Sequence, residues 1–277
     1  MKSAVAVLTR RIISSAANPL LKDVGRAVSR GQLTSEGWMV AESFHLLEEA
    51  LRGDLEVGTV LAAASVRNAV EQHVRGLKTV RVTVVDDRLM QQISSTESTQ
   101  GVISLVRPPV WNLEAVFRGR PLTVVLDGLQ DPGNAGAVVR SAEAFGATGV
   151  VFLAGCVSPY NPKTLRASAG SLFRVPFVFG VDPELAQAAM RQRKLQVLST
   201  SPRARLRLDR CDLTQPTAVA FGSEAHGVCA TFASAARAVR IPTSGVESLN
   251  AAVAAGVVLY EAARQRAAPP RQAVKST

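Results

Sequence analysis

The sequence predicts an α/β protein made of two domains. Short runs rich in valine, isoleucine and leucine alternate with segments of helical spacing along most of the chain. The 277 residues are enough for two domains of ordinary size, and a hydrophobic content of 47% is enough for a well-buried core. Pro108, Pro109 and a segment without clean periodicity up to Pro121 interrupt the alternation. We therefore predict a first domain at 1–106, a linker at 107–120, a second domain at 121–268 and a disordered tail at 269–277.

The first domain is expected to be a small layered α/β domain, because strands and helices alternate throughout it. Asn18 and Pro19 predict the start of its first helix, and Gly31 predicts the end of that helix. The polar run 94–101 is expected to be a solvated loop in preference to an RNA-contacting one. No catalytic constellation is visible in this half. Strands are expected at 38–41, 57–62, 80–85 and 101–106, and further helices at 42–52, 66–74 and 88–93.

The charge of the chain indicates a polyanionic partner that binds mainly to the second half. Lysine and arginine number 32 against 22 acidic residues, which gives a formal charge of +10. Residues 1–106 carry 12 basic and 11 acidic side chains, whereas residues 107–277 carry 20 and 11. Such a balance favours RNA or DNA ahead of an anionic membrane. The arginines that could contact phosphates, or simply form a solvated loop, are Arg203, Arg205, Arg207 and Arg210.

Composition also bears on location and on metal binding. No apolar run reaches the roughly 20 residues that span a bilayer. The apolar stretch near the N-terminus is too short for a secretion signal, so cytoplasm is the default expectation. Cys156, Cys211 and Cys229 lack the short paired spacings of a zinc site, and the three histidines form no ligand pattern. We expect no metal.

The second domain opens with a strand–loop–helix–strand unit. The apolar strand 122–126 reads as one buried on both faces of a parallel sheet, and the glycine-rich loop 127–136 follows it. A helix carrying apolar residues from 138 to 145 and a strand at 150–153 complete the unit, whose strand ends usually carry a ligand site. The loop lacks the G-x-G-x-x-G pattern of dinucleotide binding, so a nicotinamide dehydrogenase is unfavoured; the Walker phosphate loop is missing too.

Two further loops follow predicted strands in this half. Gly222 and Gly227 bracket a loop after the strand 218–221, and Pro242 stops a strand end before the polar loop 243–247. Ser248 is expected to cap the helix that follows, whose alanine and glycine residues allow close packing. Because parallel strands end at one edge of a sheet, we expect the three loops to converge there. The other expected elements are helices at 163–169 and 183–193 and strands at 177–181 and 195–199.

The loops of the second domain carry motifs that resemble a known family. The motifs are Asn134 to Arg140 with Phe145 and Gly146; Gly222, Ser223 and Glu224 with Gly227; and Ile241 and Pro242 with Ser248, Leu249 and Asn250. In order, spacing and identity they resemble the three motifs of the SpoU (TrmH-type) family of SPOUT-class RNA 2′-O-ribose methyltransferases. The segment 168–176 is similar to the family between its first two motifs, and the resemblance covers 121–264. The first half resembles the family's substrate-binding domain more loosely, through 15–22 and 100–102.

The resemblance implies more than periodicity could. It implies a parallel sheet with a deep trefoil knot, although general topology rules disfavour knots and the pattern alone suggests a Rossmann-like sheet. The preceding small α/β domain would be similar to small ribosomal RNA-binding proteins. It further implies S-adenosyl-L-methionine (AdoMet) as methyl donor, a homodimer through the C-terminal helices, and methyl transfer to a ribose 2′-hydroxyl of rRNA or tRNA, with rRNA slightly favoured.

The resemblance also assigns site residues. Backbone groups of Thr200, Gly222, Ile241 and Leu249 would surround the adenine of AdoMet, and the cofactor-binding set is completed by Ser223, Gly227, Pro242 and Ser248. The catalytic set is Arg140, Asn134, Glu224, Ser248 and Asn250. Thr243 replaces a more usual methionine, and His226 receives no role.

The role of Arg140 needs a separate argument. The family's tradition makes this arginine the base that takes the 2′-hydroxyl proton. A guanidinium is almost never deprotonated in a protein, so phosphate clamping and orientation are the preferred role. Asn134, Ser248 and Asn250 would hold the ribose and the methionine end, and Glu224 would fix its loop or pair with Arg140.

Two other functions stay open at this stage. One is a non-catalytic RNA-binding protein that keeps the fold and binds the cofactor without turning it over. The other is an enzyme of the same fold that methylates a base, although the Asn-Arg and Ser-Leu-Asn signatures favour ribose. The sequence does not decide between rRNA and tRNA, which nucleotide is modified, or whether the role is housekeeping or antibiotic resistance.

Overall fold

A computed structural model describes residues 12–77, 79–223 and 226–267 of the chain. Contacts divide the chain into two units. Unit 1 consists of Met1–Val110 and Ser158–Arg174, and unit 2 consists of Trp111–Val157 and Val175–Thr277. The predicted tail at 269–277 lies outside the described residues.

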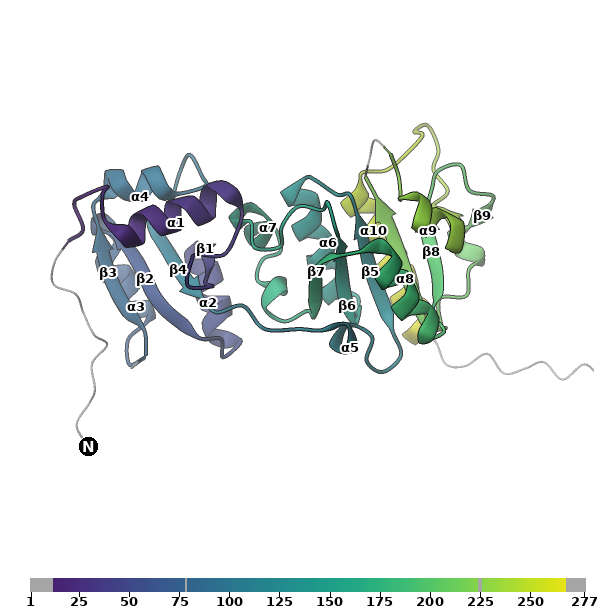
Figure 1. The fold of residues 1–277 in the computed structure, drawn as a ribbon, viewed down its shortest axis with the longest axis horizontal. Helices are drawn as coiled ribbons and strands as arrows, with labels where there is room; N and C mark the ends of the chain where they lie inside the picture. The colour runs from purple at the N-terminus through teal and green to yellow at the C-terminus, as the bar shows by residue number, and fades with distance from the viewer. Residues whose placement is uncertain (1–11, 78, 224–225, 268–277) are drawn as a thin grey trace, which may run out of the picture. The chain divides into compact units, whose positions relative to one another are not determined.

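Unit 1 is built on a four-stranded sheet in the order β1-β4-β2-β3 (Figure 1). Strand β4 is antiparallel to β1 and β2, whereas β2 and β3 are parallel. Helices α1 and α4 pack side by side, and α1, α4 and the strands bury one apolar core. The elements are α1 (Pro19–Arg30), β1 (Met39–Glu42), α2 (Phe44–Arg52), β2 (Val57–Ala63), α3 (Arg67–His73), β3 (Arg81–Val85), α4 (Asp87–Ile93) and β4 (Val102–Val106).

The elements of unit 1 form where the sequence predicts them, with ends moved by at most two residues. Helix α1 shows why. The side chain of Asn18 accepts a hydrogen bond from the backbone N–H of Leu20, and Pro19 occupies the first turn, where no N–H is needed. Gly31 ends the helix in a left-handed conformation with φ 61°.

Residues Ser158–Arg174 also belong to unit 1, although they lie between two strands of unit 2 in the sequence. They form α7 (Pro162–Ala167) and a short 3-10 helix, η2 (Ser171–Phe173). Two buried carboxylates of unit 1 bind this segment: Glu42 pairs with Arg166 at 3.4 Å, and Glu49 pairs with Arg174 at 2.6 Å. The predicted domain boundaries stay a prediction, and the contact-based units differ from them in this segment.

Unit 2 contains a seven-stranded, wholly parallel sheet in the order β7-β6-β5-β10-β8-β11-β9. The parallel α/β sheet confirms the predicted fold class at this level. The strands are β5 (Leu122–Asp127), β6 (Gly149–Leu153), β7 (Phe177–Val181), β8 (Gln196–Thr200), β9 (Leu206–Arg207), β10 (Thr217–Gly222) and β11 (Arg237–Arg240). The short 3-10 turns are η1 (Ala64–Val66) in unit 1 and η3 (Leu208–Arg210) in unit 2.

Helices cover both faces of this sheet (Figure 1). On one face α5, α8 and α9 bury an apolar core against alternate residues of β5, β6 and β10. On the other face α6 and α10 pack against each other and against β6 and β10. The helices are α5 (Leu113–Val116), α6 (Pro132–Ala144), α8 (Pro183–Gln192), α9 (Ala230–Ala235) and α10 (Ala251–Ala267).

The parallel sheet brings the three predicted loops to one edge. Strand β10 lies between β5 and β8, and β8 pairs with β11. The loops after β5, β10 and β11 therefore leave the same edge of the sheet, which confirms the expected convergence.

Among the described helices, none has the combination of length and apolar character that crossing a bilayer requires.

The starts of two helices differ from expectation. Helix α6 begins at Pro132, so the predicted loop residues Gly133 to Gly136 form its first turns. The Oδ1 of Asp131 accepts the N–H of Asn134 at 2.6 Å, and proline fits the first position. Helix α10 is capped by Asn250, not by Ser248, because the Oδ1 of Asn250 accepts the N–H groups of Ala252 and Val253.

Six short elements were not predicted: β9, α9, α5 and the 3-10 helices η1, η2 and η3. Strand β9 has two residues and α9 has six, too few for either period to be recognised. Helix α5 has four residues and lies within the predicted linker 107–120.

Gly170 and Gly155 allow a test of how closely α7 and η2 are packed in unit 1. Both glycines have φ 87°. A Cβ added to Gly170 would lie 2.8 Å from the Cβ of Glu49, whereas a Cβ added to Gly155 would meet no atom within 4 Å. We expect Gly155→Ala to cost about 1–2 kcal/mol from the left-handed backbone alone. Gly170→Ala should cost about 1–3 kcal/mol more because of overpacking. Urea denaturation measures both, and equal losses would contradict the close packing.

Candidate functional site

A cavity of about 680 Å³ lies at the carboxyl ends of β8, β10 and β11. Strand β8 contributes Thr200 and the residues after it, and β10 contributes Phe221 and Gly222. The loop between β11 and α10, together with the first turn of α10, contributes most of the remaining wall. Every lining residue belongs to unit 2.

This cavity collects most of the residues that the sequence assigned to the cofactor. Seven of them line it: Thr200, Gly222, Ser223, Gly227, Ile241, Ser248 and Leu249. Pro242, the remaining member, does not line it. Thr243, the departure from the family motif, lines it too, and its Oγ1 donates to the carbonyl of Val246. The binding roles themselves stay predictions.

A close backbone contact shapes one wall of the cavity. A Cβ on Gly222 would lie 2.0 Å from the carbonyl carbon of Gly227, so no larger residue fits at position 222 without moving the loop. Ser223 and Gly227 each donate a backbone N–H to the other's carbonyl, at 3.1 and 2.9 Å. The loop therefore closes tightly on the end of β10.

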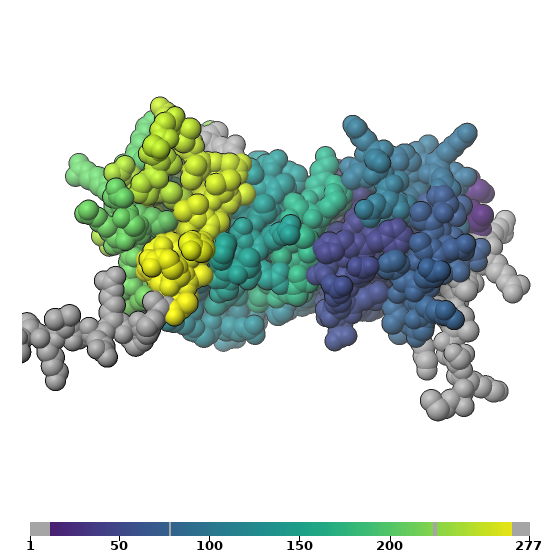
Figure 2. Space-filling view, turned by 180° about the vertical axis from the view of Figure 1, so that it is seen from behind, coloured from purple at the N-terminus to yellow at the C-terminus, as the bar shows by residue number. Residues whose placement is uncertain are grey.

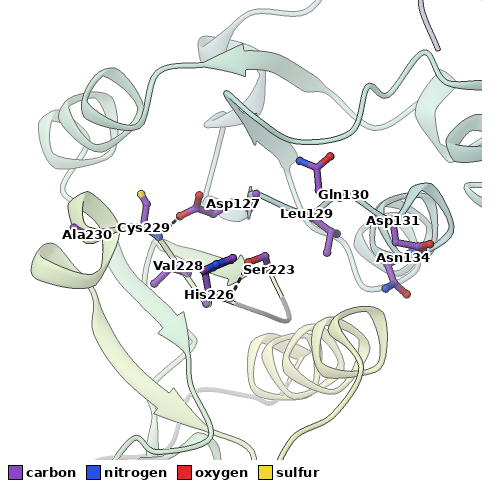
Figure 3. A pocket seen from close by; sticks show the side chains of 12 residues that line it. Asp127, Leu129, Gln130, Asp131, Asn134, Ser223, His226, Val228, Cys229 and Ala230 are labelled. Atoms are coloured by element: carbon purple, nitrogen blue, oxygen red, sulfur yellow. Dashed lines mark hydrogen bonds between the residues drawn. The ribbon is translucent and has the colours of Figure 1, made fainter. Parts of the chain in front are cut away.

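A second cavity, of about 810 Å³, adjoins the first (Figure 3). Ser223 and Gly227 line both cavities. The second cavity lies between the end of β5, the start of α6 and the loop before α9. Its other lining residues are Asp127, Gly128, Leu129, Gln130, Asp131, Asn134, His226, Val228, Cys229 and Ala230.

Hydrogen bonds connect the elements around the second cavity. Asp127, only 7% exposed, accepts the N–H of Cys229 at 2.6 Å and so ties β5 to the start of α9. The N–H of His226 donates to the Oγ of Ser223 at 3.1 Å (Figure 3). These bonds fix the loop on both sides of residues 224 and 225.

The predicted catalytic residues are only partly brought together. Asn134 and Asn250 meet, because the Nδ2 of Asn250 donates to the Oδ1 of Asn134 at 3.0 Å and joins α10 to α6. Ser248 is exposed and lines the first cavity. Arg140 is exposed on α6 and lines neither cavity. Glu224 lies outside the described residues.

Arg140 and the thiols of Cys229 and Cys156 lie in different surroundings, which decide what each group can do. Within the part of the chain that the structure describes, Arg140 has no hydrogen-bond or ion-pair partner. Burial raises the pKa of the Cys229 thiol, and the neighbouring Asp127 carboxylate raises that pKa further. Burial likewise raises the pKa of Cys156. Both thiols are therefore protonated at neutral pH and are poor nucleophiles.

Sequence reasoning missed the second cavity. Asp127, Gln130 and Cys229 received no role, and His226 was set aside explicitly. A signal was present, since Asp127, Gln130 and Asp131 follow directly after an apolar strand, where parallel sheets place ligand sites. No group of three or more His, Cys, Asp or Glu that could hold a metal ion occurs among the described residues.

The geometry defines a class of protein. Its members would have an α/β domain with a parallel sheet and cavities at the strand ends, and most of a second α/β unit would precede that domain in the sequence. Comparison with family models identifies that class. Residues 121–260 match the SpoU rRNA Methylase family, and residues 18–104 match the MRM3-like substrate binding domain. The chain belongs to the SpoU rRNA methylase family.

Individual relatives agree with this assignment. An uncharacterized tRNA/rRNA methyltransferase of Synechocystis is 34% identical over 264 residues, which cover 92% of this chain and 94% of that protein. The 23S rRNA (guanosine-2′-O-)-methyltransferase RlmB of Ralstonia nicotianae is 33% identical over 69% of this chain and 80% of its own. The crystal structure of the SpoU methyltransferase AviRb from Streptomyces viridochromogenes with AdoMet matches with a TM-score of 0.80 and 26% identity. That match covers 90% of this chain and 98% of the AviRb chain.

Gly222→Ala tests whether the first cavity is the AdoMet site. The added methyl must displace backbone of Gly227 and Val228, so we expect AdoMet to bind about tenfold to a hundredfold more weakly. Isothermal titration calorimetry measures this. Gly256→Ala on α10 is the matched control, because its Cβ would meet only the Oγ of Ser141, at 3.8 Å. Unchanged AdoMet affinity in a folded Gly222→Ala protein would contradict the assignment.

Proposed function

We propose that the protein transfers a methyl group from AdoMet to a ribose 2′-hydroxyl of RNA, with rRNA favoured over tRNA. The observation that carries this proposal is the first cavity, whose wall unites residues of the second and third family motifs, while Asn134 of the first motif lines the adjoining cavity. Names of relatives support the reaction: RlmB is a 23S rRNA 2′-O-methyltransferase, and AviRb was crystallised with AdoMet. The excess of basic residues in the second half suits an RNA partner.

The first cavity fits AdoMet in size and chemistry. Its volume lies within the roughly 300–1,000 Å³ of small-molecule sites. Ile241, Leu249 and the backbone beside Gly222 offer apolar contact and peptide groups suited to adenine. Glu247 and Ser248 supply polar side chains for the amino acid end. When bound, AdoMet supplies an electrophilic methyl group.

The side chains of the motifs would position the RNA. Arg140 is exposed, and no described residue pairs with it, so its guanidinium is available for a phosphate or ribose oxygen. Clamping and orientation are the work that a guanidinium can do here. Asn134 and Asn250 would hold the reacting groups from the joined starts of α6 and α10.

Two finer features of the fold are part of the proposal. The first is the deep trefoil knot in unit 2, supported by family membership and by the non-sequential order of β5, β10, β8 and β11. The second is a likeness of unit 1 to small ribosomal RNA-binding proteins, supported by the match to a substrate binding domain. The expected cytoplasmic location stays a prediction.

We also propose a homodimer through α10. Val253, Val257 and Tyr260 are 52%, 38% and 57% exposed at helical spacing on one stripe of α10. Tyr260 contacts the ring of Phe145 edge-on, which extends the apolar surface. Figure 2 shows α10, in yellow, at the surface of its unit. An exposed apolar stripe of this kind suits a second copy of the chain.

The reaction is tested with labelled AdoMet and unmodified bulk RNA. We expect one new 2′-O-methylnucleoside after digestion and mass spectrometry. Arg140→Ala should lower kcat/KM about a hundredfold or more by loosening substrate orientation, without changing AdoMet affinity. Arg191→Ala, at an exposed position of α8, is the control and should retain activity. AdoMet binding without product on rRNA or tRNA would favour a non-catalytic RNA-binding protein.

The dimer is tested by placing a charge in the apolar stripe. Val257→Asp should raise the dimer dissociation constant about a hundredfold or more, because a buried carboxylate without a partner is costly. Sedimentation velocity measures the change. Leu185→Asp on α8 is the control, because Leu185 is an exposed apolar residue (58%) on another helix. A dimer unaffected by Val257→Asp would place its interface elsewhere.

A further inference from the structure

We propose that the second cavity binds the base of the acceptor nucleotide and that His226 and Gln130 contact that base. The inference rests on the proposed function, because it requires RNA to approach the AdoMet cavity. It assigns a task to a cavity whose lining lies mostly outside the motif residues given a role by sequence. The base would leave its stack to enter, as it does in other enzymes that act on a single nucleotide.

The position of the cavity supports this assignment. It shares Ser223 and Gly227 with the first cavity, so a ligand in one touches the wall of the other. Methyl transfer requires the 2′-oxygen to come within contact distance of the methyl donor. A nucleoside with its ribose at the shared border would have room for its base in the second cavity, which has a volume of about 810 Å³.

The charge of the lining selects a base over a phosphate. Two carboxylates, of Asp127 and Asp131, line the cavity, and its described lining residues include no lysine or arginine. Carboxylates at this range repel a phosphate group. They accept hydrogen bonds from N–H groups, which the edges of nucleobases offer. The cavity therefore suits a neutral, hydrogen-bonding heterocycle, while the phosphates stay outside.

The walls are fixed, but two polar side chains remain available to a ligand. Asp127 is held by the N–H of Cys229, and Asp131 accepts the N–H of Asn134. In contrast, the imidazole of His226 has no hydrogen-bond partner among the described residues. The Nε2 of Gln130 donates to the carbonyl of Gly155, which leaves its Oε1 to accept.

Apolar side chains complete the cavity. Leu129 and Val228 line it beside the polar groups. Figure 3 shows Leu129, His226 and Asp127 among the side chains that line this cavity. A flat heterocycle needs such a combination, with apolar contact on its faces and hydrogen-bonding groups at its edge.

The test compares two RNAs that differ only in the base. One carries the acceptor nucleotide found in the bulk-RNA assay, and the other carries an abasic ribose there, which keeps the 2′-hydroxyl and both phosphates. We expect the wild-type protein to show a kcat/KM about tenfold or more higher on the intact RNA. His226→Ala and Gln130→Ala should each reduce that ratio severalfold, with the loss confined to the intact RNA.

Controls separate base contact from folding. AdoMet affinity by calorimetry should be unchanged in both variants. Gln192→Ala, an equivalent change at an exposed position of α8, should keep the wild-type ratio of kcat/KM on the two RNAs. His226→Gln, which retains a hydrogen-bonding side chain, should recover part of the loss in His226→Ala.

Three outcomes would overturn the inference. An active wild-type protein with equal kcat/KM on both RNAs would show that the base is not bound. Variants slowed equally on both RNAs would assign His226 and Gln130 to loop structure. Absence of methylation by the wild-type protein on any RNA would overturn the proposed function, and the base-binding role with it.

Discussion

The close approach of two backbones, at Gly222 and Gly227, is the constraint on which the rest of the site depends. It brings the loop after β10 back against the end of its own strand, where a Cβ would lie 2.0 Å from a carbonyl carbon. That loop forms the shared border of both cavities through Ser223 and Gly227. A side chain at position 222 would therefore disturb both cavities at once. The parallel sheet supplies the rigid frame, because β10 pairs with β5 on one side and β8 on the other.

Charge is distributed so that different parts of an RNA would meet different surfaces. The second cavity presents carboxylates, whereas Arg140 lies exposed on the outside of α6. A nucleotide has a neutral base and an anionic phosphate, and this arrangement separates the two. The hydrogen bond between Asn134 and Asn250 holds the starts of α6 and α10 together between these surfaces. Side chains on joined helix ends can be held more precisely than side chains on free loops.

The sequence could predict the elements and much of the first cavity, because both depend on local signals. Periodicity located nearly every strand, and the motifs located the loops at the strand ends. The predicted cap at Ser248 was wrong, because Asn250 caps α10 through the hydrogen bonds that its Oδ1 accepts from Ala252 and Val253. The lining of the second cavity was missed although the polar residues after β5 gave a signal for it, because the sequence does not show which side chains meet when β10 pairs with β5 across about 95 residues of chain.

Residues Ser158–Arg174 have a consequence for the order of folding during synthesis. Glu42 and Glu49 emerge from the ribosome long before Arg166 and Arg174, which follow 124 and 125 residues later. Until then, Glu49 has Arg52 and Glu42 has only the serine donors Ser94 and Ser95, so burial of these carboxylates is less favourable than in the complete unit. The N-terminal unit therefore cannot complete its native packing when its own four strands have been made. It must wait until about a third of the other unit, Trp111–Val157, has been translated, so the two units mature together and not in simple N-to-C succession.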